Sequence, residues 1–271
     1  MRATSEASLA AALDRFEPVL SSAGQGARSI GEEIFAVVDA LDSSTSLRRA
    51  LTDPTRNADS KAELAQSLLA GKASDDVCSL IAGMARSRWS GDRDFADALE
   101  EIGTAAVLVA AQDKGELLRL EDELFRLGRV LAGERELRIA LASADFTGER
   151  RTQLVDSLIS EQVLPETAVL VRRTVGALRQ RSVTARLAQI GELAASRRKR
   201  VVANVLAASP LNQAQVERLE KSLSRLYGTD VHVNVGIDPA IVGGLRVQVG
   251  AEVVDATVLS KLHEARRRIA G

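Results

Sequence analysis

Residues 201–237 read VVANVLAASPLNQAQVERLEKSLSRLYGTDVHVNVGI, and this stretch decides the fold class of the C-terminal part of the chain. Its first seven residues form an apolar, valine-rich run that favours a β-strand. Residues 211–226 then place apolar side chains at helical spacing, namely Val216, Leu219, Leu223 and Leu226. Residues 231–235 alternate valine with polar side chains, which is the period of a half-buried strand. A strand, a helix and a second strand in such a short stretch predict a small α/β unit.

Start and stop signals bound the helix within this stretch. Asn212 and Gln215 have the spacing of a capping box, and Leu211 with Val216 has the spacing of a hydrophobic staple. Tyr227-Gly228 is expected to end the helix, because glycine readily takes the left-handed conformation at a helix C-terminus.

The rest of the unit continues in the same manner. Residues 245–249 alternate apolar and polar side chains as a strand does, and Gly250-Ala251 suits a tight turn into a further strand at residues 252–254. A final amphipathic helix is expected, with its apolar face made of Val258, Leu259, Leu262, Ala265 and Ile269. The predicted order is therefore β-α-β-β-β-α over residues 201–271.

Residues 1–200 show helical patterns instead. Hydrophobic residues make up 45% of the chain and aromatic residues only 3%, and the prevailing Ala and Leu are good helix formers. Asp53-Pro54 interrupts the helical spacing, because proline disfavours helix at the preceding residue. Residues 105–111 are a strongly apolar segment, and residues 122–131 are predicted to carry one apolar side made of Leu124, Phe125, Leu127 and Leu131. We expect a mainly α protein, a helical bundle followed by the small α/β domain.

An internal repeat organises the helical part. Residues 31–88 align with residues 121–178 at a constant offset of 90 without gaps, and 11 of the 58 pairs are identical, against about 4 or 5 from average composition. Leu-rich helices resemble one another, but a gapless register over several helices indicates two tandem units. We expect a first helical unit at 1–115, a second at 116–200 and the α/β domain at 201–271.

Charge and motif content argue against several function classes. The chain has 36 basic and 37 acidic residues, a formal net charge of −1, so electrostatics give no reason to expect nucleic-acid binding. No phosphate-binding loop and no zinc-type spacing occurs, and the single cysteine, Cys78, cannot form an intramolecular disulfide. Gly243-Gly244 precedes a strand, so a turn with unusual backbone angles explains it better than a nucleotide site. We expect no catalytic residue, no cofactor and no metal.

The C-terminal residues contain a set of motifs in a fixed order. The motifs are Ala207-x-Ser209-Pro210-Leu211, Asp238-Pro239-x-x-Val242-Gly243-Gly244-Leu245 and Val249-Gly250-x-x-Val253-Val254-Asp255, followed by a basic final helix. As a set they resemble those of the delta subunit of F-type ATP synthase, a family whose mitochondrial counterpart confers oligomycin sensitivity. The segment from Leu47 to Pro54 is similar to the helical domain of the family. Ala256 stands where the family often has glycine. The chain is longer than a usual member by about one helical unit, so it looks like the extended form of high-GC Gram-positive bacteria (actinobacteria).

The resemblance implies a non-catalytic stator subunit that links the catalytic head to the peripheral stalk. It implies that the helical domain binds N-terminal segments of the alpha subunits, and that the C-terminal domain receives the b-type stalk subunit. It places the chain at the cytoplasmic face of the bacterial membrane. The longest uncharged run, residues 201–216, is too short and polar to span a bilayer, so we expect membrane contact only through the complex. The alternative is a generic helical scaffold or regulatory protein-binding module.

Two sets of residues are candidates for partner contacts. Leu9, Leu13 and Phe16 have helical spacing and could line a groove for a partner helix, or they could belong to the domain's own core. The cluster of Arg266, Arg267 and Arg268 could pair with acidic residues of a stalk helix, or it could be an ordinary solvated helix end. The family-motif residues are expected to form turns in the C-terminal domain.

Overall fold

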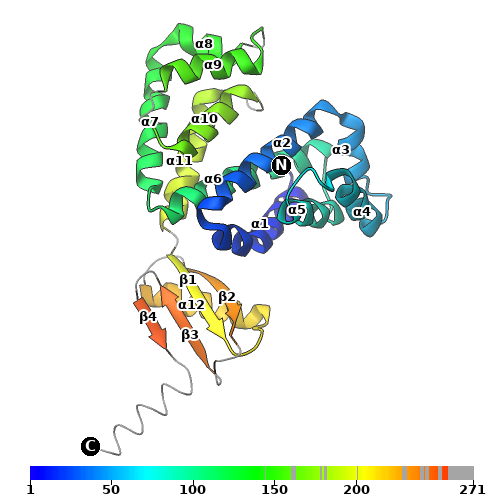
Figure 1. Cartoon of the computed structure of the whole chain (residues 1–271), viewed down its shortest axis with the longest axis vertical. Coiled ribbons are helices and arrows are strands. Elements are labelled where there is room, and N and C mark those ends of the chain that lie inside the picture. Colours follow the sequence, from blue (N-terminus) through cyan, green and yellow to red (C-terminus); the bar gives the residue numbers. More distant parts are fainter. Residues whose placement is uncertain are drawn as a thin grey trace, which may run out of the picture. The chain divides into compact units, whose positions relative to one another are not determined.

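The computed structural model describes residues 1–143, 145–159, 163–177, 179, 182–199, 201–227, 231–238, 241, 244–249 and 252–255 (Figure 1). The chain divides into two compact units, Met1–Ala195 and Ser196–Gly271. We call the first the helical body and the second the C-terminal unit, and each is described by itself. The predicted helical part followed by a small α/β domain is confirmed.

The helical body is built from helices joined by short connections. The helices of its first half are α1 (Ala3–Ala23), η1 (Gly24–Gly26), α2 (Ala27–Ser43), α3 (Thr45–Thr52), α4 (Ala58–Leu69), α5 (Asp75–Arg86) and α6 (Asp92–Asp113). The helices of its second half are α7 (Leu117–Gly133), α8 (Arg135–Ala142), α9 (Gly148–Leu158), α10 (Pro165–Gly176) and α11 (Val183–Lys199). The predicted interruption at Asp53-Pro54 is confirmed, because α3 ends at Thr52 and α4 begins at Ala58.

The internal repeat is confirmed at the level of helix bounds. Helices α7, α8, α9 and α10 begin at residues 117, 135, 148 and 165, each 90 residues after α2, α3, α4 and α5 begin at 27, 45, 58 and 75. Helix α6 ends at Asp113, 90 residues after α1 ends at Ala23. Since α6 also closes the first unit, it serves as the last helix of one copy and the first helix of the next.

Polar contacts recur at the same offset. In each copy an arginine of the third helix caps the preceding helix, and a glutamate of the second helix accepts a hydrogen bond from the chain before the fifth. The recurring pairs are Arg48 Nη1 to Leu41 O at 2.6 Å and Arg138 Nη1 to Leu131 O at 3.0 Å, then Ser74 N to Glu33 Oε2 at 2.9 Å and Leu164 N to Glu123 Oε2 at 3.0 Å. The repeat therefore conserves both the helices and the contacts that join them.

Two hydrophobic cores fill the helical body, and α6 contributes to both. Leu99 and Ile102 of α6 belong to the first core, and Val107 and Leu108 of the same helix belong to the second. A helix with apolar residues on most of its circumference suits this buried position between two cores. The two predicted helical units thus share α6, and the division between them at 115/116 stays a prediction.

Helix α2 crosses α6 at two glycines. A Cβ added at Gly31 would lie 2.8 Å from the carbonyl oxygen of Gly103, and one added at Gly103 would lie 2.7 Å from the ring of Phe35. Side chains larger than hydrogen do not fit at such distances, so these two glycines set the separation of the helices.

The predicted apolar side of α7 was wrong at one position. Leu124 and Leu131 are buried and Leu127 is partly buried in the second core, but the side chain of Phe125 is 64% exposed. Successive residues of an α-helix lie about 100° apart, so Phe125 cannot share the direction of Leu124. Phe125 instead faces away from the core that its neighbours fill.

The C-terminal unit has the predicted order β-α-β-β-β over its described residues. Its elements are β1 (Val201–Ala207), α12 (Gln213–Tyr227), β2 (Val231–Ile237), β3 (Leu245–Val249) and β4 (Glu252–Asp255). The sheet order is β2-β1-β3-β4, with β1 parallel to β2 and antiparallel to β3, and β3 antiparallel to β4. The predicted final helix lies outside the described residues, and so do Arg266, Arg267 and Arg268.

Helix α12 packs on the sheet and starts as predicted. Asn212 N–H donates to Gln215 Oε1 at 2.8 Å and Gln215 N–H donates to Asn212 Oδ1 at 2.9 Å, which confirms the capping box. Leu223 packs with valines of the strands, but Leu226 is 72% exposed, so its predicted place on the apolar face was wrong. Tyr227, four residues after Leu223, packs against this core instead, as the helical period allows.

Candidate functional site

A groove lies between α1 and α5, next to the residues that the sequence singled out. It has a volume of about 190 Å³ and is lined from α1 by Phe16 and from α5 by Leu80 and Gly83, among others. Of the three predicted groove residues, Phe16 lines it, but Phe16 is only 5% exposed and is also part of the first core. Leu9 and Leu13 are partly buried, pack against that core and do not line the groove. Their contact with a partner stays a prediction.

The lining of the groove is mainly apolar. It includes Phe16 and Leu80, and it carries opposite charges in Arg15 of α1 and Asp76 of α5. A Cβ at Gly83 would meet no atom within 4 Å, so the α5 side leaves room for an incoming side chain. An amphipathic helix can bury its apolar side against a lining of this kind.

The counterpart of this groove in the second unit is covered by the chain itself. Under the offset of 90, Phe16, Leu80 and Asp76 correspond to Ala106, Leu170 and Glu166, which are all buried. Helix α2 lies over them: Arg28 of α2 stands 3.7 Å from Glu166 of α10, while Gly31 contacts α6. Two copies of one groove therefore differ, one open between α1 and α5 and one closed by α2.

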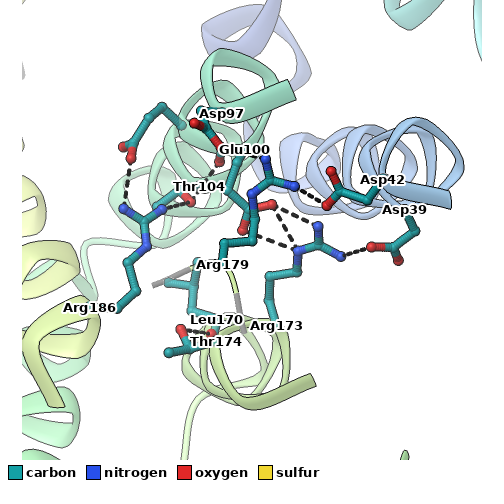
Figure 2. Close-up of polar contacts among 11 residues, drawn as sticks. Asp39, Asp42, Asp97, Glu100, Thr104, Leu170, Arg173, Thr174, Arg179 and Arg186 are labelled. Atoms are coloured by element: carbon teal, nitrogen blue, oxygen red, sulfur yellow. Dashed lines mark hydrogen bonds and ion pairs between the residues drawn. The ribbon is translucent and has the colours of Figure 1, made fainter. Parts of the chain in front are cut away.

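Three arginines join the two halves of the helical body, and Figure 2 shows them reaching across to carboxylates of α2 and α6. We call Arg173, Arg179 and Arg186 with their carboxylate partners the arginine clamp. Arg173 of α10 donates to both oxygens of Glu100 at 2.7 to 3.1 Å, and to Asp39 at 2.6 Å.

The other two arginines extend the clamp along the same interface. Arg179, in the connection after α10, pairs with Asp42 of α2 and Asp97 of α6. Arg186 of α11 donates to Glu101 at 2.7 Å and to Thr104 at 3.1 Å, both on α6 (Figure 2). Since each arginine is paired, the cluster holds helices together rather than offering a reactive group.

The Arg173–Glu100 pair is the buried centre of the clamp. Its two side chains are only 10% and 11% exposed, and the guanidinium carbon lies 4.8 Å from the ring centre of Phe35. Burial by itself lowers the pKa of Arg173, but the hydrogen bonds and charges of Glu100 and Asp39 outweigh it and raise the pKa above its ordinary value. The clamp could not be predicted from the sequence, because its partners lie 73 to 137 residues apart and no local pattern connects them.

The family-motif residues of the C-terminal unit lie at strand ends where they are described. Asp238 N–H donates to Ala207 O at 3.0 Å just after β2, and Gly244 has φ +90° just before β3. A positive φ suits glycine, in keeping with the unusual turn expected there. Asp255 ends β4, opposite Arg246. Pro239, Gly243 and Gly250 lie outside the described residues.

Among the described residues, no group of three or more His, Cys, Asp or Glu side chains is placed to hold a metal ion. No helix in the described part of the chain is both long enough and apolar enough to cross a bilayer.

The described residues form a protein of two parts, a helical body with an apolar groove between α1 and α5 and a small α/β unit. The sequence model of the family described as ATP synthase delta (OSCP) subunit matches residues 104–269. The chain is 64% identical over all 271 residues to ATP synthase subunit delta of Beutenbergia cavernae, and both chains are covered completely. It is 42% identical to the protein of that name from Streptomyces griseus and 41% to that from Thermobifida fusca, again with complete coverage of both chains.

The chain belongs to the ATP synthase delta (OSCP) subunit family. It is therefore a non-catalytic stator subunit of the F-type ATP synthase and part of a membrane-associated complex. The family match begins within α6, so it contains α7 to α11 and the C-terminal unit and leaves α1 to α5 outside it. The expected extension by one helical unit stays a prediction, and relatives of the same full length also carry the region before the match.

Proposed function

We propose that the groove between α1 and α5 receives an amphipathic N-terminal segment of an alpha subunit of the catalytic head. The observation that supports this proposal is the difference between the two copies of the groove. The α6/α10 copy lies within the family match, yet it is covered by α2, whereas the α1/α5 copy is open. In this proposal, α2 of the first unit covers the α6/α10 groove, and the open α1/α5 groove of the first unit takes over the docking.

We further propose that the C-terminal unit receives the b-type stalk subunit, at the cytoplasmic face of the membrane. A stator link carries a holding force, so its two ends need a stiff connection within the chain. The helical body supplies stiffness through the shared α6 and the arginine clamp, because neither half moves without breaking a buried ion pair. The strength of attachment at each end then depends on the docking surfaces. A nanomolar Kd corresponds to a binding free energy of about 12 kcal/mol in magnitude.

The test of head docking fills the groove without touching the core. Gly83→Trp places a large side chain where a Cβ meets no atom within 4 Å. Binding of a synthetic peptide with the alpha subunit's N-terminal sequence, measured by calorimetry on the full chain, is expected to weaken about tenfold or more. Gly133→Trp is the matched control, because Gly133 of α7 also has open space around its Cβ but lies outside the groove. Equal affinities for the two variants would refute the proposed docking site.

The test of stalk docking uses the basic cluster at residues 266–268. Replacing Arg266, Arg267 and Arg268 by Ser is expected to weaken binding of the b-type subunit and to flatten its salt dependence, because exposed charge pairs are screened by salt. The affinity is measured over a series of salt concentrations. Unchanged affinity and an unchanged salt slope would leave these arginines as a solvated helix end.

A further inference from the structure

A second groove lies between α7 and α11, on the helices of the second unit. Its volume is about 650 Å³, and its lining is mainly apolar, with Leu124, Gly128, Leu187 and Gly191 among the residues that form it. Phe125 and Leu118 stand along it with side chains 64% and 59% exposed. Large apolar side chains gathered along one groove mark an interaction surface more often than scattered ones do.

The groove is open because the second unit lacks a glycine of the first. In the first unit α2 lies directly on α6 at Gly31, where a Cβ would stand 2.8 Å from the oxygen of Gly103. The residue 90 positions later is Glu121, which lines the groove. A glutamate does not fit in a crossing of that kind, so α7 and α11 enclose a space where α2 and α6 make contact.

The corresponding surface of the first unit is already occupied by a helix. Phe35 is 5% exposed: its ring lies against Gly103 of α6 on one side, and Arg173 of α10 stands over the ring at 4.8 Å. Phe125 occupies the position 90 residues after Phe35, and it has no such cover. The second unit is the last copy, so there is no third unit whose fifth helix would lie there.

The charges around the groove differ from those under α10. Asp39 and Asp42, which hold Arg173 and Arg179, correspond to Arg129 and Ala132, which both line the groove. Glu121, Asp122 and Glu192 also line the groove, but an arginine placed as Arg173 of α10 is placed over Asp39 would meet a like charge at Arg129.

We propose that the α7/α11 groove docks an amphipathic helix of another protein chain, which lies against Phe125 as α10 lies against Phe35 and turns an acidic side chain toward Arg129. The lining of this groove shares no residue with the lining of the α1/α5 groove, so it gives the stator a further attachment. Such an attachment would restrain the helical body against rocking about its docking point.

The first test locates the occupant in the assembled ATP synthase. A benzoylphenylalanine photo-cross-linker is placed at position 125, and at position 146 as the control, because Phe146 is a 42% exposed phenylalanine of the same unit outside the groove. The proposal expects cross-links from position 125 to one helical segment of another subunit, with apolar residues on one side and at least one acid. Cross-links only within the chain, cross-links to a second copy of it, or none beyond those at position 146 would overturn the proposal.

The second test measures the contribution of the groove. A synthetic peptide of the cross-linked segment is titrated into the full chain carrying Phe125→Glu, Arg129→Glu or the control Phe146→Glu. Phe125→Glu and Arg129→Glu are each expected to weaken binding about tenfold or more, and Phe146→Glu by less than about twofold. Phe125 and Arg129 are both exposed, so the fold is expected to tolerate these changes, and circular dichroism confirms it. Equal losses in all three variants would refute the docking site.

Discussion

Removal of Arg173 tests whether the arginine clamp makes one body of the two helical units. Arg173→Ala takes away the guanidinium that α10 inserts between Glu100 of α6 and Asp39 of α2. It leaves Glu100 with its side chain 11% exposed and with the partner that neutralised it gone. The variant therefore weakens the interface between the units rather than either core.

The expected loss of stability follows from the burial of each partner. A buried carboxylate left without its cation costs about 3–5 kcal/mol, and Glu100 is such a group. The contact of Arg173 with the Phe35 ring contributes about 0.5–2 kcal/mol within that loss. Asp39 is 61% exposed, so its pair adds little, about 0–1 kcal/mol. At about 2–4 °C per kcal/mol for a domain of this size, we expect Tm to fall by about 6–20 °C.

The loss of coupling between the two units is measured by urea unfolding, monitored with two probes. Fluorescence of Trp89, the only tryptophan, reports on the first unit, and far-UV circular dichroism reports on all helices. The two transitions are expected to coincide in the natural chain and to separate in Arg173→Ala.

The neighbouring arginine supplies the control. Arg172 pairs with Asp156, but their side chains are 49% and 39% exposed, so Arg172→Ala is expected to cost less than about 1 kcal/mol. Replacing the buried pair together, as Arg173→Met with Glu100→Leu, is expected to recover most of the loss, because no buried charge is left unpaired and Asp39 is 61% exposed. Equal costs for Arg172→Ala and Arg173→Ala would refute the reasoning.

Two further predictions concern packing and pH. Gly31→Ala brings a Cβ to 2.8 Å from the Gly103 oxygen and is expected to lower the free energy of unfolding by about 1–3 kcal/mol. Gly83→Ala meets no atom within 4 Å and is expected to raise it by up to about 1 kcal/mol. Thermal unfolding of both variants checks this, and a Gly31→Ala variant as stable as the natural chain would contradict it. Burial lowers the pKa of Lys61 from its usual 10.5, against the opposing charge of Asp53. Between the lowered pKa and 10.5 the unfolded chain binds more protons at this lysine than the folded chain does. The free energy of unfolding of the natural chain, relative to that of Lys61→Met, should therefore rise as pH climbs toward 10.5. Urea titrations over a pH series measure this difference, and a difference that does not change with pH would count against it.

Several local features could be predicted because they depend on neighbours in the chain. The capping box of Asn212 and Gln215 spans one helical turn, and the strand alternation of residues 231–235 follows from backbone geometry alone. The repeat offset of 90 was visible in identities and reappears in helix bounds and polar contacts. The two misplaced residues, Phe125 and Leu226, show the limit of this reasoning, because apolar character does not say which side of a helix is covered.

The candidate sites needed more than local pattern. Leu9, Leu13 and Phe16 were proposed for a groove by their spacing, but the spacing did not show that only Phe16 lines it, nor that Phe16 also belongs to the first core. The arginine clamp has no sequence signature. Arg173 cannot be distinguished from a surface arginine by sequence, and only the structure places Glu100 beside it.

The sequence alone determined the helices, the strands, the tandem repeat and the family, because each depends on the order of side chains along a short stretch or on likeness to relatives. The tertiary structure decided which copy of each surface is open. Two copies that are similar in sequence receive different neighbours: α2 covers the α6/α10 groove and α10 covers Phe35, while the last copy has no further unit to cover Phe125. The physical reason is that periodicity tells which side of a helix is apolar, whereas burial depends on which distant element lies against it.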